Sequence, residues 1–250
     1  MKKIIFTYFF CFFTSALFSA DGASLFKSGN DFYAKEDFEN AIRNYEMSAV
    51  TTQSADLYFN LGNSYFKSGN VPKAILNYEC ARKLSPDDED LKFNLNLANQ
   101  KITDRIDSAP ALLIRDWWAD FCNNLSVDGW AVLSICIFVF ALVMLSLFIV
   151  AGNILAKRVG FFTFVISGII LLCSLLITHR QYRLMINHDS AIIMSESVNV
   201  KSSPVDNGKQ LFLLHAGTKI EIVSTLDDWC EISLPNKTKG WMKKADLENI

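Results

Sequence analysis

The chain has 250 residues, of which 51% are hydrophobic, 20 are Phe and 20% are charged, with a formal net charge of −2 at pH 7. The near-neutral charge and the lack of a long basic run exclude nucleic acid as the main partner. No HExxH, P-loop, GxGxxG or Ser-His-acid arrangement with motif context occurs, so we expect no enzyme, no cofactor and no metal site. The six cysteines lack close spacing, which favours unpaired thiols; a disulfide framework or a zinc site is the alternative.

The N-terminus begins with Lys2 and Lys3, continues with a largely apolar run over residues 4–18, and reaches the small residues Ser19 and Ala20. A basic start, a short apolar run and small residues after it are typical of a secretory signal peptide. We therefore predict a signal peptide over residues 1–20. An uncleaved anchor is the alternative, and in either case the following residues are exported.

Self-similarity follows at a spacing of 33 residues, which separates Gly29 from Gly62, Ala41 from Ala74 and Tyr45 from Tyr78. A glycine facing a small residue lets two helices cross closely, so each unit is predicted to be a helical hairpin. Residues 22–54 and 55–88 resemble tetratricopeptide repeats. The second unit carries the family pattern at Tyr58, Leu61, Gly62, Tyr65, Ala74, Tyr78, Ala81 and Pro86, whereas the first has Leu25 for the usual Trp and Gln53 for the usual Pro.

The repeat domain is predicted to span residues 21–107. After Pro86, acidic residues at 87–90 and apolar residues from Leu91 onward indicate a further helix. We predict that it covers residues 89–106, either as a capping helix or as a truncated third unit. About three repeats are usually needed to bury a continuous core, so such an addition is expected.

The resemblance implies a partner-binding groove lined by the first helix of each repeat. The groove positions are Phe26, Asn30, Tyr33, Phe59, Asn60, Asn63, Phe66 and Lys67. Asn30 and Asn60 match two polar positions of the repeats that clamp a C-terminal carboxylate. Phe26 and Asp90 stand where that clamp has lysines, so we do not expect carboxylate capture.

Residues 109–127 begin with a break at Pro110 and then carry an amphipathic pattern with the aromatic pair Trp117 and Trp118. Trp favours the headgroup region of a bilayer, which suggests a helix lying in the membrane interface. A connecting helix packed on the repeat domain is the alternative.

Two uncharged stretches, residues 130–151 and 159–178, have 22 and 20 residues. Each reaches the ~20 residues that cross a hydrocarbon core as a helix. We predict transmembrane helices over 129–151 and 159–179 with a cytoplasmic loop at 152–158, which carries Lys157 and Arg158. The short loop makes a hairpin, so the chain before and after it lies on one side, and the signal peptide places that side outside the cytoplasm.

After Tyr182 the pattern changes to short runs of period two, separated by turns. Strands are expected at residues 191–195, 198–201, 211–214, 219–224, 229–234 and 240–242, and strands this short favour a closed barrel. Residues 190–250 resemble bacterial SH3 domains through Val198–Lys201, Pro204, Gly217-Thr218, Asp228–Ile232 and Gly240–Met242. Trp229 and Trp241 are the candidate partner-binding aromatics of this domain.

The predicted fold is a multidomain membrane protein with α-helical repeats, a two-helix transmembrane hairpin and a small all-β SH3-like barrel. This layout resembles the BatE family of the aerotolerance (Bat) operons. The resemblance implies a scaffold in the bacterial inner membrane that serves oxygen or stress tolerance and binds other envelope proteins, among them von Willebrand A domain membrane proteins. A cell-wall sensor whose barrel binds peptidoglycan and an accessory subunit of a transport complex are the alternatives.

Overall fold

A computed structural model of the chain describes residues 22–106, 117–118, 121–186 and 189–250. The signal peptide expected at residues 1–20 and most of the segment expected at the membrane interface lie outside the described residues. The chain divides into two compact units. We call them the repeat–barrel unit (Met1–Pro110 with His188–Ile250) and the hairpin unit (Ala111–Asn187).

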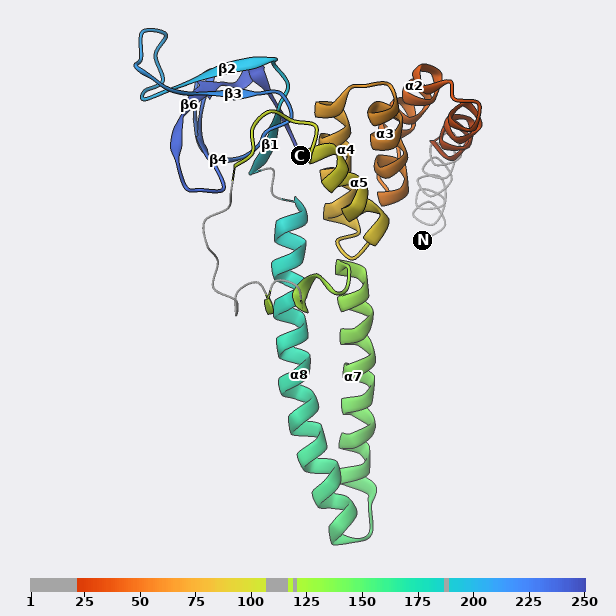
Figure 1. The fold of residues 1–250 in the computed structure, drawn as a ribbon. Coiled ribbons are helices and arrows are strands. Elements are labelled where there is room, and N and C mark those ends of the chain that lie inside the picture. The colour runs from red at the N-terminus through yellow and green to blue at the C-terminus, as the bar shows by residue number, and fades with distance from the viewer. Residues whose placement is uncertain (1–21, 107–116, 119–120, 187–188) are drawn as a thin grey trace, which may run out of the picture. The chain divides into compact units, whose positions relative to one another are not determined.

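Five helices make the first part of the repeat–barrel unit (Figure 1). A first helix covers residues 22–34, followed by α2 (Phe38–Ala49), α3 (Ala55–Lys67), α4 (Val71–Leu84) and α5 (Glu89–Asn99). Each of the four labelled helices begins where a short polar side chain accepts a hydrogen bond from a backbone N–H three residues later. These capping residues are Asp37, Ser54, Asn70 and Asp88.

The two repeats share the same packing contact. Tyr45 and Tyr78 are both 1% exposed, and each lies against the glycine of its own repeat. A Cβ on Gly29 would come within 2.5 Å of the Tyr45 ring, and one on Gly62 within 2.6 Å of the Tyr78 ring. Any larger residue would separate the helices, which explains the repeated glycine.

Helix α5 is shorter than the sequence indicates. The pattern predicts a helix to residue 106, but α5 ends at Asn99, and Lys101 closes a turn by donating to the oxygen of Ala98 at 2.9 Å. The side chains of Ile102, Asp104 and Ile106 then contact the barrel. This segment is therefore held by residues more than a hundred positions away, which local periodicity does not reveal.

The barrel contains one antiparallel sheet in the order β3-β2-β6-β5-β4-β1-β7. Its strands are β1 (Ser190–Ile193), β2 (Ser197–Lys201), β3 (Gln210–His215), β4 (Lys219–Leu226), β5 (Trp229–Ser233), β6 (Lys239–Lys243) and β7 (Leu247–Asn249). The first six match the predicted strands closely. A short 3-10 helix, Lys244–Asp246, follows β6, and β7 follows it. With three residues, β7 is too short to show a period of two.

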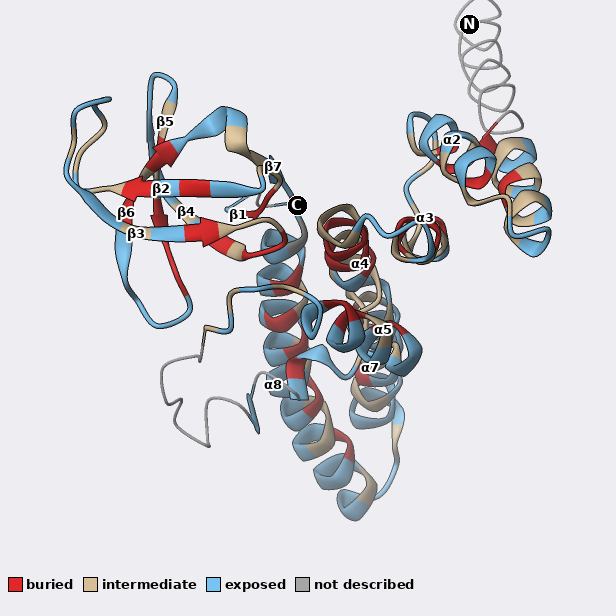
Figure 2. Ribbon diagram, turned by 45° about the horizontal axis from the view of Figure 1, so that its top comes forward, coloured by how far each residue is buried: buried red, intermediate tan, exposed pale blue. Residues whose placement is uncertain are grey.

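Buried residues alternate with more exposed ones along β2, β5 and β6 (Figure 2), as expected where successive side chains point to opposite faces of a sheet. Val200, Ile232 and Met242 are fully buried and form the barrel core with other inward residues. The predicted small all-β domain is thus confirmed as an antiparallel sheet with its own core.

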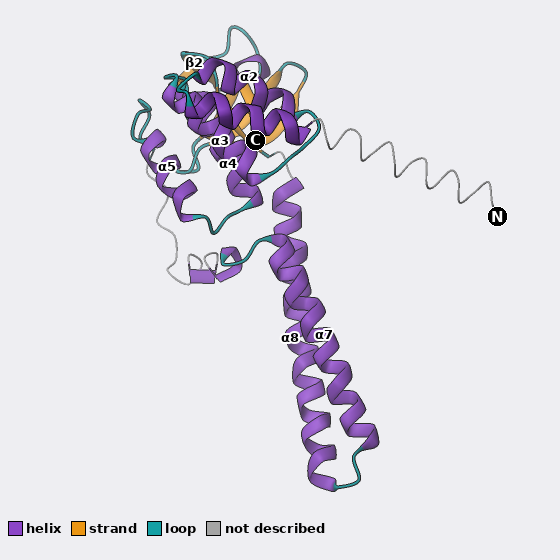
Figure 3. Ribbon diagram, turned by 90° about the vertical axis from the view of Figure 1, so that its right-hand side faces the viewer, coloured by secondary structure: helices purple, strands orange, loops and turns teal. Residues whose placement is uncertain are grey.

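The hairpin unit consists mainly of α7 (Val127–Val150) and α8 (Ile154–Ile186), which run side by side in opposite directions (Figures 1 and 3). Both are long and apolar enough to cross a membrane. Only 11% and 22% of their most apolar windows are buried, so most of their apolar surface is exposed. The connection is shorter than the predicted loop 152–158, because Asn153 accepts from the Ala156 N–H and starts α8 at Ile154.

The contact between α7 and α8 uses small residues at a spacing of seven. On α8 these are Gly160, Ser167 and Ser174, all buried. Ser174 Oγ lies 2.7 Å from Ser134 Oγ of α7. A repeat of seven keeps one seam facing the partner helix, and small residues let the backbones approach without hydrophobic driving force. The outer faces of both helices remain exposed and apolar.

Candidate partner-binding surfaces

The first helix of each repeat presents the same face. Residues 26, 30 and 33 share one side of the first helix, and residues 59, 63 and 66 share the matching side of α3, because neighbours three and four apart align. All six side chains are partly exposed, and Lys67 is exposed at the end of α3. The structure thus brings seven of the eight predicted groove residues onto two adjacent helix faces; the eighth, Asn60, bridges them.

The bridge is a hydrogen-bonded pair of asparagines. Asn60 Nδ2 donates to Asn30 Oδ1 at 3.1 Å, and the same oxygen accepts from the Tyr45 hydroxyl at 2.7 Å. One repeat further on, Asn94 Nδ2 donates to Asn63 Oδ1 at 2.9 Å, and the Tyr78 hydroxyl donates to it at 2.8 Å. The two networks are translated copies, so they connect the first helix, α3 and α5.

In these networks the side-chain oxygens of Asn30 and Asn63 accept hydrogen bonds, whereas their amide nitrogens take no part. Among the described residues, neither Nδ2 group donates a hydrogen bond to the protein. An amide side chain has two donors on its nitrogen, and both are therefore free for a ligand here. Because the bonds to Tyr45 and Tyr78 fix the oxygen, they also fix the direction in which the nitrogen points.

Phenylalanine rings flank the asparagines. Phe26 lies 5.8 Å from Tyr45 and Phe59 lies 6.0 Å from Tyr78, measured between ring centroids. Burial raises the pKa of Tyr45 to about 12 and also raises the pKa of Tyr78, so both hydroxyls remain donors at physiological pH. Each phenylalanine is therefore supported from behind by a neutral tyrosine.

Helix α5 continues this surface, which the sequence analysis missed. Phe93 follows Phe59 by 34 residues and Leu97 follows Asn63 by 34. Phe93 is 68% exposed and Leu97 is 36% exposed. Extending the repeat spacing by one more unit would have found them. We define the groove face as Phe26, Asn30, Tyr33, Phe59, Asn60, Asn63, Phe66, Lys67, Phe93, Asn94 and Leu97.

Trp229 and Trp241 lie on the outward face of the barrel. Glu231 pairs with Trp241 and Trp229 pairs with Lys243 across β5 and β6, while the intervening Cys230 is buried. The ammonium groups of Lys201 and Lys243 lie 5.3 and 5.5 Å from the centre of the Trp229 ring. Both tryptophans are partly exposed, so this outward face combines aromatic rings with cations.

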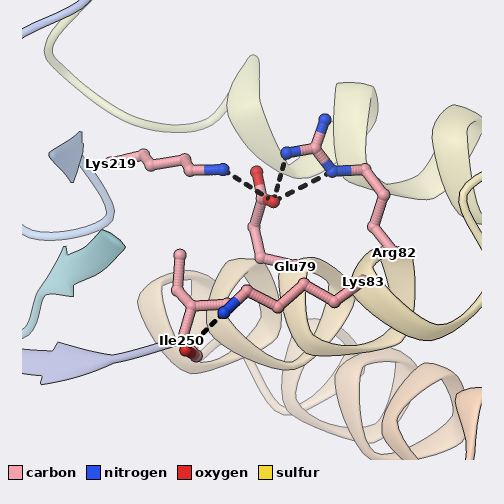
Figure 4. Close-up of polar contacts among 5 residues, drawn as sticks. All are labelled: Glu79, Arg82, Lys83, Lys219 and Ile250. Carbon is pink, nitrogen blue, oxygen red and sulfur yellow. Dashed lines mark hydrogen bonds and ion pairs between the residues drawn. The ribbon is translucent and has the colours of Figure 1, made fainter. Parts of the chain in front are cut away.

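A second cluster joins the repeats to the barrel (Figure 4). Glu79 of α4 is 5% exposed and accepts hydrogen bonds from Arg82 and from Lys219 of β4, the latter at 2.9 Å. Lys83 donates to the backbone oxygen of Ile250 at 2.9 Å. Burial alone would raise the pKa of Glu79, but Lys219 and Arg82 hold that pKa below its usual value. Glu79 is therefore ionised in the folded unit.

Asp104 makes a further connection, since three donors of the barrel converge on its carboxylate. These are the backbone N–H of His215 at 2.6 Å, its Nδ1 at 2.8 Å, and the hydroxyl of Thr218 at 2.8 Å. Although partial burial opposes it, these bonds lower the pKa of Asp104. Neither cluster could be predicted from local sequence patterns, because each joins residues more than a hundred positions apart.

Comparison with known families agrees with this architecture. Residues 55–88 match the tetratricopeptide repeat and residues 196–248 match the bacterial SH3 domain. No match was found among curated proteins. The chain therefore contains a tetratricopeptide repeat and a bacterial SH3 domain, two modules that imply protein-binding partners. The first repeat, residues 22–54, lies outside the matched range and rests on its shared Gly–Tyr contact and asparagine network.

Proposed function

We propose that the protein is a membrane-anchored scaffold, not an enzyme, and that its groove face binds an extended segment of another protein of the bacterial envelope. The observation that carries this proposal is the repeated row of asparagines and phenylalanines on the first helix, α3 and α5. A row of side chains with the same spacing suits a ligand that is itself linear. The polar groups give orientation and the exposed rings give apolar contact area.

The chemistry of the groove face favours an uncharged, apolar segment. The free Nδ2 groups of Asn30 and Asn63 would donate to peptide carbonyls, and apolar side chains of the ligand would pack against Phe59 and Phe93. The exposed charges nearby are mixed, with Lys67 and Asp90 of opposite sign. Phe26 and Asp90 also leave no lysine pair for a terminal carboxylate, so an internal segment is the proposed ligand.

The anchor is proposed to be the α7–α8 hairpin. Its apolar surface is exposed, while Ser134 and Ser174 satisfy each other within the seam. The repeats and the barrel belong to one compact unit although they flank the hairpin in the chain. A chain that leaves a folded unit and returns to it crosses a bilayer an even number of times, which two spans satisfy.

The sequence favours the extracytoplasmic side for the repeat–barrel unit, because the N-terminal segment has the features of a signal peptide and the link carries Lys157 and Arg158. Trp117, Trp118 and Phe121 are exposed next to α7, and the rings of Trp117 and Trp118 lie 6.1 and 5.7 Å from the Phe121 ring. We propose that they lie at the headgroup level of the inner membrane. The layout also supports the BatE resemblance, and with it a role in aerotolerance beside von Willebrand A domain proteins.

A second function is favoured by the outward face of the barrel. Trp229 with Lys201 and Lys243 would suit an anionic ligand that carries apolar groups, such as a peptidoglycan stem peptide. The protein would then sense the cell wall. Retention of the full chain on purified cell wall, lost in the Trp229→Ala variant, would support this role, and equal retention of both would remove it. The transport alternative is less supported, because Ser134 and Ser174 bond each other.

The groove is tested by crosslinking partners in intact cells and purifying the full chain in detergent. The variant Phe59→Ala/Phe93→Ala removes apolar area from the groove face, and the partners are expected to be lost. Met47→Ala is the matched control, because Met47 is an exposed apolar residue of α2 outside the groove face. If the double variant and the control recover the same partners in equal yield, the groove does not bind them.

The topology is tested separately with single cysteines on a chain whose native cysteines are replaced. A membrane-impermeant maleimide added to intact spheroplasts is expected to label Lys239→Cys in the barrel and to leave Asn153→Cys in the link unlabelled. Labelling of Asn153→Cys without lysis would place the link outside and reverse the proposed orientation.

A further inference from the structure

Helix α4 is buried on more than one side. Its residues from Ala74 to Glu79 are six consecutive buried positions. A helix packed along one face buries only every third or fourth residue. In an array of repeats, the second face of such a helix is covered by the second helix of the next repeat. Here the third unit supplies only α5, because the chain turns away after Asn99.

The barrel supplies the missing cover. Ile192 of β1 and Ile250, which follows β7, belong to the same buried cluster as Ile75 and Tyr78 of α4. Their side chains are 0% and 5% exposed. The apolar core of the repeats therefore includes two residues of the barrel, while the barrel keeps its own core.

Close contacts at the turn between β3 and β4 extend this cover to the segment after α5. Gly217 has a φ of +90°, and a Cβ there would come within 2.5 Å of Ile102 and 3.4 Å of Ile75. The glycine is thus needed twice, once for its backbone conformation and once for the approach of the repeat domain. Beside it, Asp104 accepts its three hydrogen bonds from His215 and Thr218.

The charged groups of the contact fix its geometry. Glu79 is ionised and almost fully buried, and Lys219 is its partner across the contact. A buried charge that loses its partner is strongly destabilising, whereas the intact pair adds little to stability. The pair therefore favours this docking position over others.

From these contacts we infer that the barrel is the C-terminal cap of the repeat domain and takes the place of the second helix of the third repeat. The inference does not depend on any ligand of the groove face. It gives the SH3 part a structural role within the chain. It also means that the part of the barrel around Ile192 and Ile250 faces the repeats, so a ligand of the barrel must use another face.

Hydrogen exchange of the full chain in detergent tests this cap. The variant Asp104→Ala/Lys219→Ala removes acceptor and donor at two points of the contact. We expect amide protection in α4 and α5 to fall about tenfold or more, which corresponds to about 1.4 kcal/mol. Amides of β5 and β6, remote from the contact, should keep their protection and show that the barrel stays folded.

The single variant Asp104→Ala changes no residue of the barrel or of the repeat helices. We expect it to lower amide protection in α4 and α5 by a smaller factor. Asp90→Ala removes an exposed carboxylate of α5 and is the matched control. Unchanged protection of α4 and α5 in both Asp104 variants would overturn the inference. So would a loss in the Asp90→Ala control as large as that in Asp104→Ala.

Discussion

Replacing Asn63 by Ala removes the oxygen that accepts from the Tyr78 hydroxyl at 2.8 Å and from Asn94 Nδ2 at 2.9 Å. The Asn94 amide is partly exposed and recovers a bond to water. The Tyr78 side chain is 1% exposed, so its hydroxyl is left buried without a partner. A stranded buried donor costs about 1–3 kcal/mol, and the lost bond to Asn94 adds about 0.5 kcal/mol.

We therefore expect Asn63→Ala to lower the free energy of unfolding of the repeat–barrel unit by about 2–3 kcal/mol. For a unit of this size, the melting temperature should fall by about 5–10 °C. The measurement is thermal unfolding of the full chain in detergent, followed by far-ultraviolet circular dichroism. Asn30→Ala strands Tyr45 in the same way and should give a similar loss, because the two networks are copies.

A double-mutant cycle isolates the hydrogen bond. In the wild-type background, Tyr78→Phe should cost about 1 kcal/mol. In the Asn63→Ala background it should cost nothing or restore stability, because it removes the stranded hydroxyl. Equal costs of Tyr78→Phe in the two backgrounds would show no coupling and would refute the assigned network.

Three further outcomes follow from the contacts. The folded pKa values of Glu79 and Asp104 lie below their unfolded values. The stability that these two groups contribute is therefore complete above about pH 4 and is lost as the pH falls through the folded values. The free energy of unfolding should decrease in acid, and Asp104→Asn should make this decrease smaller. Gly160→Val should lower the stability of the hairpin by about 1–3 kcal/mol in detergent unfolding, since a Cβ would lie 2.8 Å from the Phe148 nitrogen. Gly168→Ala is the control, because a Cβ there meets nothing within 4 Å. Equal losses in the two variants would contradict the assigned contact between α7 and α8. Cys173 is exposed on α8, so in a chain whose other cysteines are replaced a charged maleimide should leave it unlabelled in intact membranes and label it after unfolding in denaturing detergent; labelling in intact membranes would place it in water.

Much of the fold could be predicted from the sequence because its signals are local. The spacing of Gly29 and Gly62 requires two similar hairpins, and the alternation around Val200 and Ile232 requires strands with one buried face. The uncharged stretches gave the two apolar helices. These patterns depend only on neighbours within one helix or strand, so the helical region, the hairpin and the antiparallel barrel were all predicted.

The candidate sites divide in the same way. Helical geometry determines which residues lie on the groove side of the first helix and of α3, so these residues could be predicted from their spacing. Asn30 and Asn63 were expected as polar groove residues, but their division into a bonded oxygen and a free nitrogen depends on Tyr45 and Tyr78. The contact between Glu79 and Lys219 spans 140 positions of sequence, and no periodicity connects them. The end of α5 at Asn99 has the same origin, because Asp104 finds its donors only in the barrel.

The contact of Asp104 with the barrel has a consequence for biosynthesis. His215 and Thr218, which donate to Asp104, leave the ribosome after α7 and α8. The side of α4 that the barrel covers therefore stays exposed until both apolar helices have been synthesised. A nascent chain that stalls or misinserts at the bilayer would expose that bare side to proteases and chaperones. If the proposed hairpin topology holds, the C-terminal strands would cover α4 only in chains whose two apolar helices have been inserted correctly.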